Sequence, residues 1–379
     1  KKAFNYRAFF FMGSMILDNL KLRCYRNLAD VDVSWSGHFN VIYGQNAQGK
    51  TNLLEAIYLL GHLKSFRGAR GHELIEHAAA TAWVGAKVEK NGVQHQLAMN
   101  LQKTGRTPCI NGKTVKKLSD FLGYLRIVIF TPEELNCVKG FPAGRRSLLD
   151  RAILQTDPAY LDRVQEYDRI LRQRNQLLKQ QVDDQQLAPW TAALVRTGSR
   201  IRQNRLTYLA RFLPRLCQAY REITAGSESA DLKYSIEENT IEALSGYLEE
   251  ALQRLAPREK KLGLTLAGPH RDDLDFLVGE RSLRSFGSQG QQRSFLLAFK
   301  AAQVMDLEKE MQDPPVLLLD DLASELDLRR QEGFFNFLLQ RNGQIFLTSA
   351  QQTLLTDAVR QKASYYKVDQ GTVSTISPG

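Results

Sequence analysis

Residues 39–57 read FNVIYGQNAQGKTNLLEAI, and this stretch decides the fold. The β-branched and aromatic run Phe39–Tyr43 predicts a buried strand, and Asn52–Ile57 continues as an amphipathic helix. Between them stands the pattern GxxxxGK[ST], whose glycines let the backbone turn its N–H groups toward phosphates. The order of strand, glycine-rich loop and helix predicts a nucleotide-binding loop of the Walker A type in an α/β fold.

The positions of this loop have expected contacts. Lys50 is expected to reach the β and γ phosphates of ATP, and the Thr51 hydroxyl is expected to ligate Mg²⁺. ATP and Mg²⁺ are therefore the expected cofactors. The loop residues expected to bind the nucleotide are Gly44, Gln45, Asn46, Ala47, Gln48, Gly49, Lys50, Thr51 and Asn52.

A second motif stands far along the chain, where the apolar run Val316–Leu319 ends in two carboxylates. Asp320 is expected to hold Mg²⁺, and Asp321 to polarise the attacking water. Asp321 and Lys50 are thus the expected catalytic residues. Apolar strands often end in aspartate, but the combination with a phosphate loop strongly favours an ATPase.

Residues 285–293, SFGSQGQQR, lead into a predicted helix. Their core, Ser288-Gln289-Gly290-Gln291, resembles the signature of ABC ATPases, in which a serine hydroxyl and glycine amides contact a γ-phosphate. Ser324 and Asp327 resemble the D-loop of the same family. In ABC ATPases the signature acts in trans on the partner's nucleotide, so the resemblance implies an ATP-dependent homodimer. A plain helix cap at Ser288 is the alternative.

The composition of the 379 residues is that of an ordinary globular protein, with 43% hydrophobic and 24% charged residues. No apolar run has membrane-spanning length, so no membrane partner is expected. The four cysteines form no CxxC pair, which favours a reduced, cytoplasmic setting. A net charge of +10 favours a polyanionic partner, and residues 139–221 hold most of the excess, with 16 Lys and Arg against 7 Asp and Glu.

The chain is expected to form an ABC-type P-loop ATPase head assembled from both ends, with an inserted helical domain. Residues 15–138 alternate short strands with turns, including the hairpin signals Asn91-Gly92 and Asn111-Gly112, and predict an α/β part with an antiparallel flap. Residues 139–258 predict an Arg-rich helical arm, and residues 259–379 return to the head.

Three local features refine this division. The proline pairs Ala188-Pro189 and Leu213-Pro214 are expected to break the long helix of the arm. Leu262–Ala267 is expected to be the first strand after the arm. Residues 1–14, KKAFNYRAFFFMGS, are expected to be an expression leader without a signal peptide.

Several short segments resemble the RecF family of bacterial recombination mediators, which is related to SMC and Rad50 heads. These are CYRNL at 24–28, KSFR at 64–67, FTPEEL at 130–135, VKG at 138–140 and GPHRDD at 268–273. The resemblance implies ATP-dependent binding to duplex or gapped DNA and cooperation with RecR and RecO in placing RecA on DNA. It also implies that Arg26, Asn27 and Arg67 help to hold the nucleotide, although surface salt bridges would account for Arg26 and Arg67 as well.

The arm is the expected DNA-contacting surface, with a solvated basic face as the alternative. Its candidate phosphate contacts are Arg196, Arg200, Arg202 and Arg205. Asp321 stands where ABC transporters carry glutamate, and Thr348-Ser349-Ala350 stands where a switch histidine is common. Slow hydrolysis, suited to a switch that releases its DNA, is therefore expected.

Three other functions stay open. A transporter ATPase subunit is opposed by the Arg-rich insert and by the strand Ile127–Phe130, which does not end in the glutamine of a Q-loop. A short SMC or Rad50-type head is opposed by the insert, which has no sustained heptads. A small-molecule P-loop kinase would have no need of the SQGQ and SELD segments.

Overall fold

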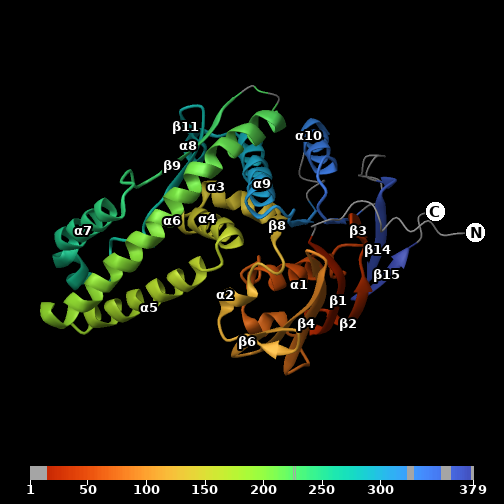
Figure 1. Ribbon diagram of the computed structural model, residues 1–379, viewed down its shortest axis with the longest axis horizontal. Coiled ribbons are helices and arrows are strands. Elements are labelled where there is room, and N and C mark those ends of the chain that lie inside the picture. Colours follow the sequence, from red (N-terminus) through yellow and green to blue (C-terminus); the bar gives the residue numbers. More distant parts are fainter. Residues whose placement is uncertain (1–14, 225, 227, 322–327, 351–359, 377–379) are drawn as a thin grey trace, which may run out of the picture. The chain divides into compact units, whose positions relative to one another are not determined.

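The computed structural model describes residues 15–224, 226, 228–321, 328–350 and 360–376. The expected leader, residues 1–14, and the expected D-loop residues Ser324 and Asp327 lie outside this part. The chain divides into two compact units, one that joins Lys1–Pro132 to Gln303–Gly379 and one that consists of Glu133–Ala302. The first unit therefore combines the red and blue ends of the chain in Figure 1, and the second is inserted between them in sequence.

A six-stranded sheet in the order β15-β14-β3-β13-β12-β8 forms the core of the first unit. Strand β3 pairs in parallel with both β13 and β14, so that segments from the two ends of the chain lie side by side. Only β15 is antiparallel to its neighbour. The strands are β3 (Phe39–Tyr43), β8 (Ile127–Phe130), β12 (Val316–Leu319), β13 (Ile345–Ser349), β14 (Ala363–Asp369) and β15 (Thr372–Ile376).

Burial on both faces explains the apolar sequences of the central strands. Every residue of β8, β12 and β13 is buried, as is usual where helices or a second sheet cover a parallel sheet. Helix α1 (Lys50–His62) follows β3 and buries Leu53, Leu54 and Ile57. Helix α10 (Leu328–Leu339) contributes Phe334, whose ring packs edge-on against Phe130 at 4.9 Å between centroids.

The second sheet of this unit is antiparallel throughout, in the order β2-β1-β4-β5-β6-β7. The predicted hairpin turns Asn91-Gly92 and Asn111-Gly112 are confirmed, and all four residues have positive φ angles. Its strands are β1 (Ile16–Tyr25), β2 (Leu28–Ser34), β4 (Thr81–Lys90), β5 (Val93–Gln102), β6 (Gly105–Ile110) and β7 (Lys113–Thr114). The short helices η2 (Gly71–Leu74) and α2 (Leu118–Phe121) complete the unit.

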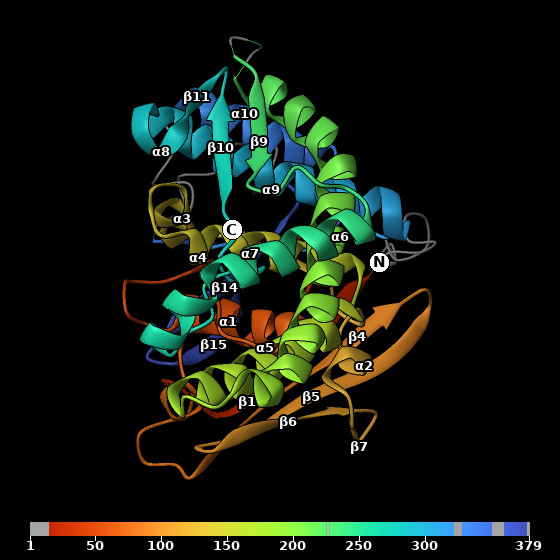
Figure 2. The same ribbon diagram turned by 90° about the vertical axis from the view of Figure 1, so that its left-hand side faces the viewer.

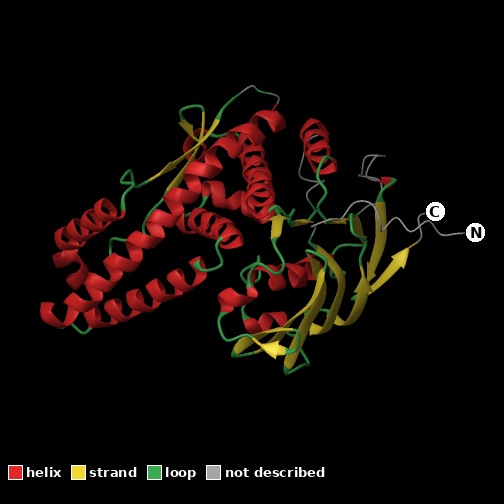
Figure 3. Ribbon diagram, in the orientation of Figure 1, coloured by secondary structure: helices red, strands yellow, loops and turns green. Residues whose placement is uncertain are grey.

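Helices dominate the second unit (Figure 3), and α5 and α7 both pack along the long helix α6 (Figure 2). A three-stranded sheet, β11-β10-β9, accompanies them. The elements are η3 (Pro132–Leu135), α3 (Asn136–Lys139), α4 (Pro142–Thr156), α5 (Tyr160–Lys179), α6 (Asp184–Thr224), β9 (Ala230–Tyr234), α7 (Ile241–Leu262), β10 (Leu274–Val278), β11 (Arg281–Ser282), α8 (Leu283–Phe286) and α9 (Gln289–Met311), which continues into the first unit. Among the described residues, no helix is long and apolar enough to span a membrane.

Two local predictions are wrong. Pro189 and Pro214 do not break the arm, because both lie inside the single helix α6. Buried side chains on both sides of Pro214, such as Phe212 and Leu216, hold the helix together by tertiary packing where one backbone hydrogen bond is lost. Leu262–Ala267 is not a strand either, since α7 runs to Leu262 and Gly263 ends it in a left-handed conformation.

The units divide the chain differently from the expected boundaries. Residues 259–302, expected in the head beside the Walker B segment, belong to the same unit as the helical arm. Strand β10 explains this, because it pairs with β9 at the end of the arm. The signature segment therefore lies in the inserted unit, and the two Walker motifs lie in the other.

Buried arginine–aspartate pairs tie α6 to the GPHRDD segment. Arg202 donates two hydrogen bonds to Asp272, of 3.0 and 2.7 Å, and the two side chains are only 3% and 4% exposed. Arg205 binds Asp150 in the same bidentate way, at 2.9 and 3.0 Å, and donates to the Pro269 carbonyl at 2.8 Å. Such forked pairs are strong and geometrically specific.

The expectation that Arg202 and Arg205 contact DNA phosphates is therefore wrong. Both guanidinium groups are buried and neutralised by carboxylates of their own unit, so they present no charge to a polyanion. Arg196 and Arg200 are exposed on the same helix and stay candidates. The sequence pattern does not separate the two exposed arginines from the two buried ones, because all four lie in one Arg-rich helical pattern.

We expect Arg202→Met to lower the free energy of unfolding by about 3–5 kcal/mol, because it leaves the buried Asp272 without its cation. Arg200→Met on the exposed face of the helix is the control and should change stability by less than about 0.5 kcal/mol. Urea denaturation followed by circular dichroism measures both. Equal effects of the two substitutions would contradict a structural role for the Arg202–Asp272 pair.

Candidate nucleotide site

The phosphate loop leaves β3 at Gly44 and enters α1 at Gly49, whose φ of 115° favours glycine. The Lys50 ammonium donates hydrogen bonds to the loop carbonyls of Gly44, at 2.6 Å, and Gln45, at 2.9 Å. Burial lowers the pKa of Lys50, and the carboxylates of Asp321 and Asp320 oppose that shift. The lysine thus lies within the loop and near both Walker B carboxylates, and its contact with a phosphate stays a prediction.

Asp320 directly follows strand β12 and is buried next to the start of α1. Its carboxylate accepts hydrogen bonds from the hydroxyl of Thr51, at 3.1 Å, and from that of Thr348, at 2.8 Å. Asp321 follows with a φ of 47°, and its backbone N–H donates to the Thr348 hydroxyl at 2.9 Å. The Thr348 hydroxyl thus contacts the carboxylate of Asp320 and the backbone of Asp321.

Thr348 also contacts the Walker B residues, and no role for it was expected from the sequence. It lies near the end of β13, and its single hydroxyl connects Asp320 to the backbone of Asp321. The signal was a threonine near the end of a buried strand, at the position where a switch histidine is common. A side-chain hydroxyl here can hold both acidic residues in place but cannot act as a base at neutral pH.

The donor set suits Mg²⁺. The hydroxyl of Thr51 and a carboxylate oxygen of Asp320 meet at 3.1 Å, and both are hard oxygen ligands of the kind Mg²⁺ prefers. Among the described residues, no group of three or more His, Cys, Asp or Glu side chains forms a metal cluster. Mg²⁺ needs none, since it commonly uses one or two protein ligands together with waters and substrate phosphates.

Arg26 lies in the turn between β1 and β2, and its side chain contacts helix α1. Its guanidinium donates two hydrogen bonds to the fully buried carboxylate of Glu55, at 2.8 and 2.9 Å, and the Ser65 hydroxyl donates to the same carboxylate. Glu55 therefore connects two of the family-like segments, CYRNL through Arg26 and KSFR through Ser65. The part of Arg26 in nucleotide binding stays a prediction, whereas its ion pair with Glu55 is present in the structure.

Asn27 and Arg67 form a chain of polar contacts along the outside of the loop. The Asn27 amide donates to the carbonyl of Gln48 at 3.2 Å, and Asn52 donates to the Asn27 side chain at 2.8 Å. Arg67 in turn donates to Asn52 at 3.3 Å. The structure thus brings these expected nucleotide-binding residues together with the phosphate loop.

The signature segment begins α9 in the other unit. The Ser288 hydroxyl accepts from the N–H of Gln291 at 3.1 Å, and the Gln291 side chain accepts from the N–H of Ser288 at 3.0 Å. This reciprocal pattern is a capping box. Ser288 is therefore a helix cap, as the alternative expected. Its exposed hydroxyl accepts a hydrogen bond in this role and can still donate its proton to an oxyanion.

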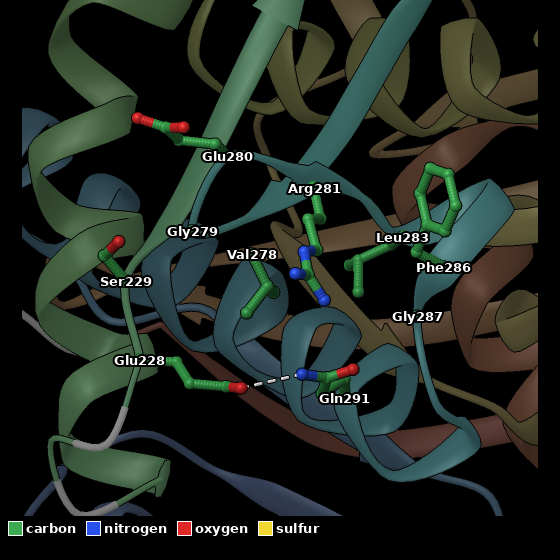
Figure 4. A pocket seen from close by; sticks show the side chains of 10 residues that line it. All are labelled: Glu228, Ser229, Val278, Gly279, Glu280, Arg281, Leu283, Phe286, Gly287 and Gln291. Carbon is green, nitrogen blue, oxygen red and sulfur yellow. Dashed lines mark hydrogen bonds between the residues drawn. The ribbon is translucent and has the colours of Figure 1, made fainter.

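A pocket of about 610 Å³ lies beside this helix start (Figure 4). It is lined by the segment just before β9, by the turn between β10 and β11, by α8 and by the first turn of α9, and Val278 and Leu283 supply apolar lining. Gln291 also faces it, and its amide donates to Glu228 at 2.7 Å. Gln291 is thereby fixed from two sides, by Ser288 and by Glu228.

The fold and the site together define an ABC-type P-loop ATPase head. The Walker A loop and the Walker B aspartate lie at the carboxyl ends of strands in one parallel sheet, built from both ends of the chain. A signature-like helix start lies in the inserted unit.

Comparison with known proteins places the chain within this class. The RecF/RecN/SMC N-terminal domain family matches residues 16–374. The DNA replication and repair protein RecF of Syntrophotalea carbinolica is 46% identical over 94% of this chain and 98% of its own length. RecF of Geotalea daltonii is 39% identical over 95% of this chain and 100% of its own length. The chain belongs to the RecF family.

Solved structures agree with this assignment. The recombination mediator protein RecF-ATP in the RecFOR pathway has a TM-score of 0.87 at 30% identity and covers 96% of this chain and all of its own. The corresponding RecF-ATPrS structure has a TM-score of 0.88 at 29% identity, with coverage of 97% and 99%. An Smc head domain from Pyrococcus furiosus, at a TM-score of 0.55 and 16% identity, shares the fold.

We expect Thr348→Val to slow ATP hydrolysis by roughly tenfold, because Asp321 loses its backbone anchor and Asp320 loses a donor. The dissociation constant for ATP should change by less than about threefold, since the loop itself is untouched. Thr107→Val, at an exposed position of β6, is the control and should leave both values unchanged. Phosphate-release assays and calorimetry measure them. An unchanged rate of ATP hydrolysis in Thr348→Val would contradict a role for Thr348 in hydrolysis.

Proposed function

We propose that this chain is an ATP-dependent DNA-binding recombination mediator of the cytoplasm. It dimerises on binding ATP, binds duplex or gapped DNA and helps to place RecA during recombinational repair, with RecR and RecO as partners. Two findings on similar proteins support the proposal: relatives are DNA replication and repair proteins, and RecF-ATP is a recombination mediator in the RecFOR pathway. Family membership also favours this role over a transporter subunit or a small-molecule kinase.

The observation that supports dimerisation is that the chain has one Walker A loop and one signature-like segment, like half of the symmetric pair that ABC ATPases form. The Walker A loop and Asp320 belong to one unit and the Ser288 helix start to the other, and each motif occurs once in the sequence. Two copies related by a twofold axis complete two sites, with Ser288 of each copy donating to the γ-phosphate held by the other. The capping box supports this, because Gln291 fixes Ser288 while its hydroxyl proton stays available.

ATP hydrolysis opens the closed, ATP-bound dimer. Mg²⁺, when bound by Thr51 and Asp320, supplies a positive charge that stabilises charge on the phosphates. Asp321 orients the attacking water, and Thr348 holds the backbone of Asp321. The aspartate side chain is one methylene shorter than the glutamate of ABC transporters, so its hold on the water is looser and turnover is slow.

DNA is bound through phosphate contacts of exposed cations. Arg196 and Arg200 are the members of the original set that stay available on the surface of α6. Contacts of this kind position the duplex without reading its sequence, which suits a protein that acts at gaps of any sequence.

Ser288→Arg should bind ATP as a monomer but fail to dimerise, because a bulky cation replaces the hydroxyl that faces the partner's nucleotide. Ser34→Arg, at an exposed position of β2, is the control and should dimerise normally. Sedimentation velocity with and without ATP distinguishes the species. If Ser288→Arg formed normal ATP-dependent dimers, Ser288 would act only as a helix cap and not at the partner's nucleotide.

Asp321→Asn should bind ATP, because Asp320 and Thr51 remain, but should not orient the attacking water. The closed dimer should accumulate, so labelled duplex DNA should dissociate at least roughly tenfold more slowly than from the parent protein in the presence of ATP. Asp320→Asn should instead lose the closed state. Dilution into competitor DNA measures these rates. Equal dissociation rates for the parent and Asp321→Asn would show that hydrolysis does not gate release.

A further inference from the structure

The turn between β14 and β15 lies against the phosphate loop. The backbone N–H of Gln370 donates to the side-chain oxygen of Gln48 at 2.6 Å, and the N–H of Gly371 approaches the Gln48 carbonyl at 3.3 Å. In Figure 1, β14 stands beside β3, from which the loop begins, and β15 stands on the far side of β14. A two-residue turn from the far end of the chain thus holds one residue of the loop by both its side chain and its backbone.

There is no free space at this contact. A Cβ atom on Gly371 would lie 2.1 Å from the carbonyl oxygen of Asn27, and a Cβ on Gly44 would lie 2.3 Å from the carbonyl oxygen of Val368. Both neighbours are backbone atoms, which cannot rotate away as a side chain can. The turn of β14 and β15 therefore packs against the turn of β1 and β2, and the start of the loop packs against strand β14.

Two other hairpins of the same unit show that the turn conformation alone does not require this contact. Gly92, Gly112 and Gly371 have φ angles of 75°, 77° and 79°, and each is the second residue of a two-residue turn. Added Cβ atoms at Gly92 and Gly112 would meet nothing within 4 Å. The first two turns need glycine only for its φ angle, whereas the third also needs it for its close approach to Asn27 in the turn between β1 and β2.

We infer that the Gln370-Gly371 turn is a positioning element of the nucleotide site. It fixes Gln48, the residue directly before the Gly49-Lys50 corner, so that the loop amides face the phosphates before the nucleotide arrives. Pre-organisation matters here because Gln45, Asn46 and Ala47 are exposed and gain little from packing. Binding then spends less free energy on ordering the loop. The inference rests on nucleotide binding as proposed above.

The test compares Gly371→Ala with Gly92→Ala in the full chain. Both substitutions place a β-carbon at the same strained φ angle, but only the first meets the carbonyl of Asn27. We expect Gly371→Ala to weaken ATP binding by about tenfold or more, and Gly92→Ala by less than about twofold. Gly112→Ala, in the other hairpin turn that has no neighbour within 4 Å, should likewise bind ATP like the parent. Calorimetry on samples checked for folding by circular dichroism gives the affinities.

A double-mutant cycle with Gln48→Ala tests the route of the effect. If the turn acts through Gln48, the losses from Gly371→Ala and Gln48→Ala should not add. Additive losses would overturn the assigned route. A parent protein that does not bind ATP would overturn the proposed function, whereas a folded Gly371→Ala that binds like the parent would overturn this inference alone.

A measurement on the unaltered protein covers the case in which Gly371→Ala does not fold. Saturating ATP should slow hydrogen exchange at the amides of Gln370 and Gly371 by several-fold, because a loop held by phosphates holds the turn in return. The Asn91-Gly92 turn is the internal control and should not respond. Slower exchange in the phosphate loop with unchanged exchange at Gln370 and Gly371 would overturn the inference.

Discussion

The parallel pairing of β3 with β13 and β14 is the constraint on which the nucleotide site depends. Strand β3 carries the phosphate loop at its carboxyl end, and β13 brings Thr348 to the same edge of the sheet. Because carboxyl ends of parallel strands meet at one edge, residues from opposite ends of the chain become neighbours within hydrogen-bond distance of Asp320. If these strands did not pair, Lys50 and the Walker B carboxylates would belong to unconnected segments.

The inserted unit shows that a count of basic residues overstates the charge offered to a partner. Asp150, Asp272 and Asp273 each bind an arginine of the arm, and the arginines involved are buried. A buried charge costs several kcal/mol unless it is paired and hydrogen-bonded, which explains the forked geometry of these contacts. The GPHRDD segment thereby connects α4, through Asp273, to α6, through Asp272. The positive charge that the arm offers to a polyanion depends on the arginines that remain outside such pairs.

The contacts around the phosphate loop share one physical purpose. The Asn27 amide and the Gln370 and Gly371 amides all converge on Gln48, and Arg26 fixes the helix behind the loop through Glu55. Each contact comes from a turn with positive φ angles, where the backbone approaches another segment closely. An exposed glycine-rich loop has little packing of its own, so its conformation has to be supported by neighbouring elements. Segments that look unrelated along the chain therefore act on one loop.

The sequence by itself determined the phosphate loop, the Walker B strand and the two Asn-Gly hairpins, because each depends on short-range spacing and residue type. Family resemblance also indicated that Asn27, Arg26 and Arg67 help to hold the nucleotide, which stays a prediction. Only the tertiary structure decided that Arg202 and Arg205 are buried, that α6 continues through Pro189 and Pro214, that Thr348 contacts Asp320 and that Gly371 lies against Asn27 and Gln48. Each of these depends on partners distant in the sequence, whose burial and close approach no local pattern records.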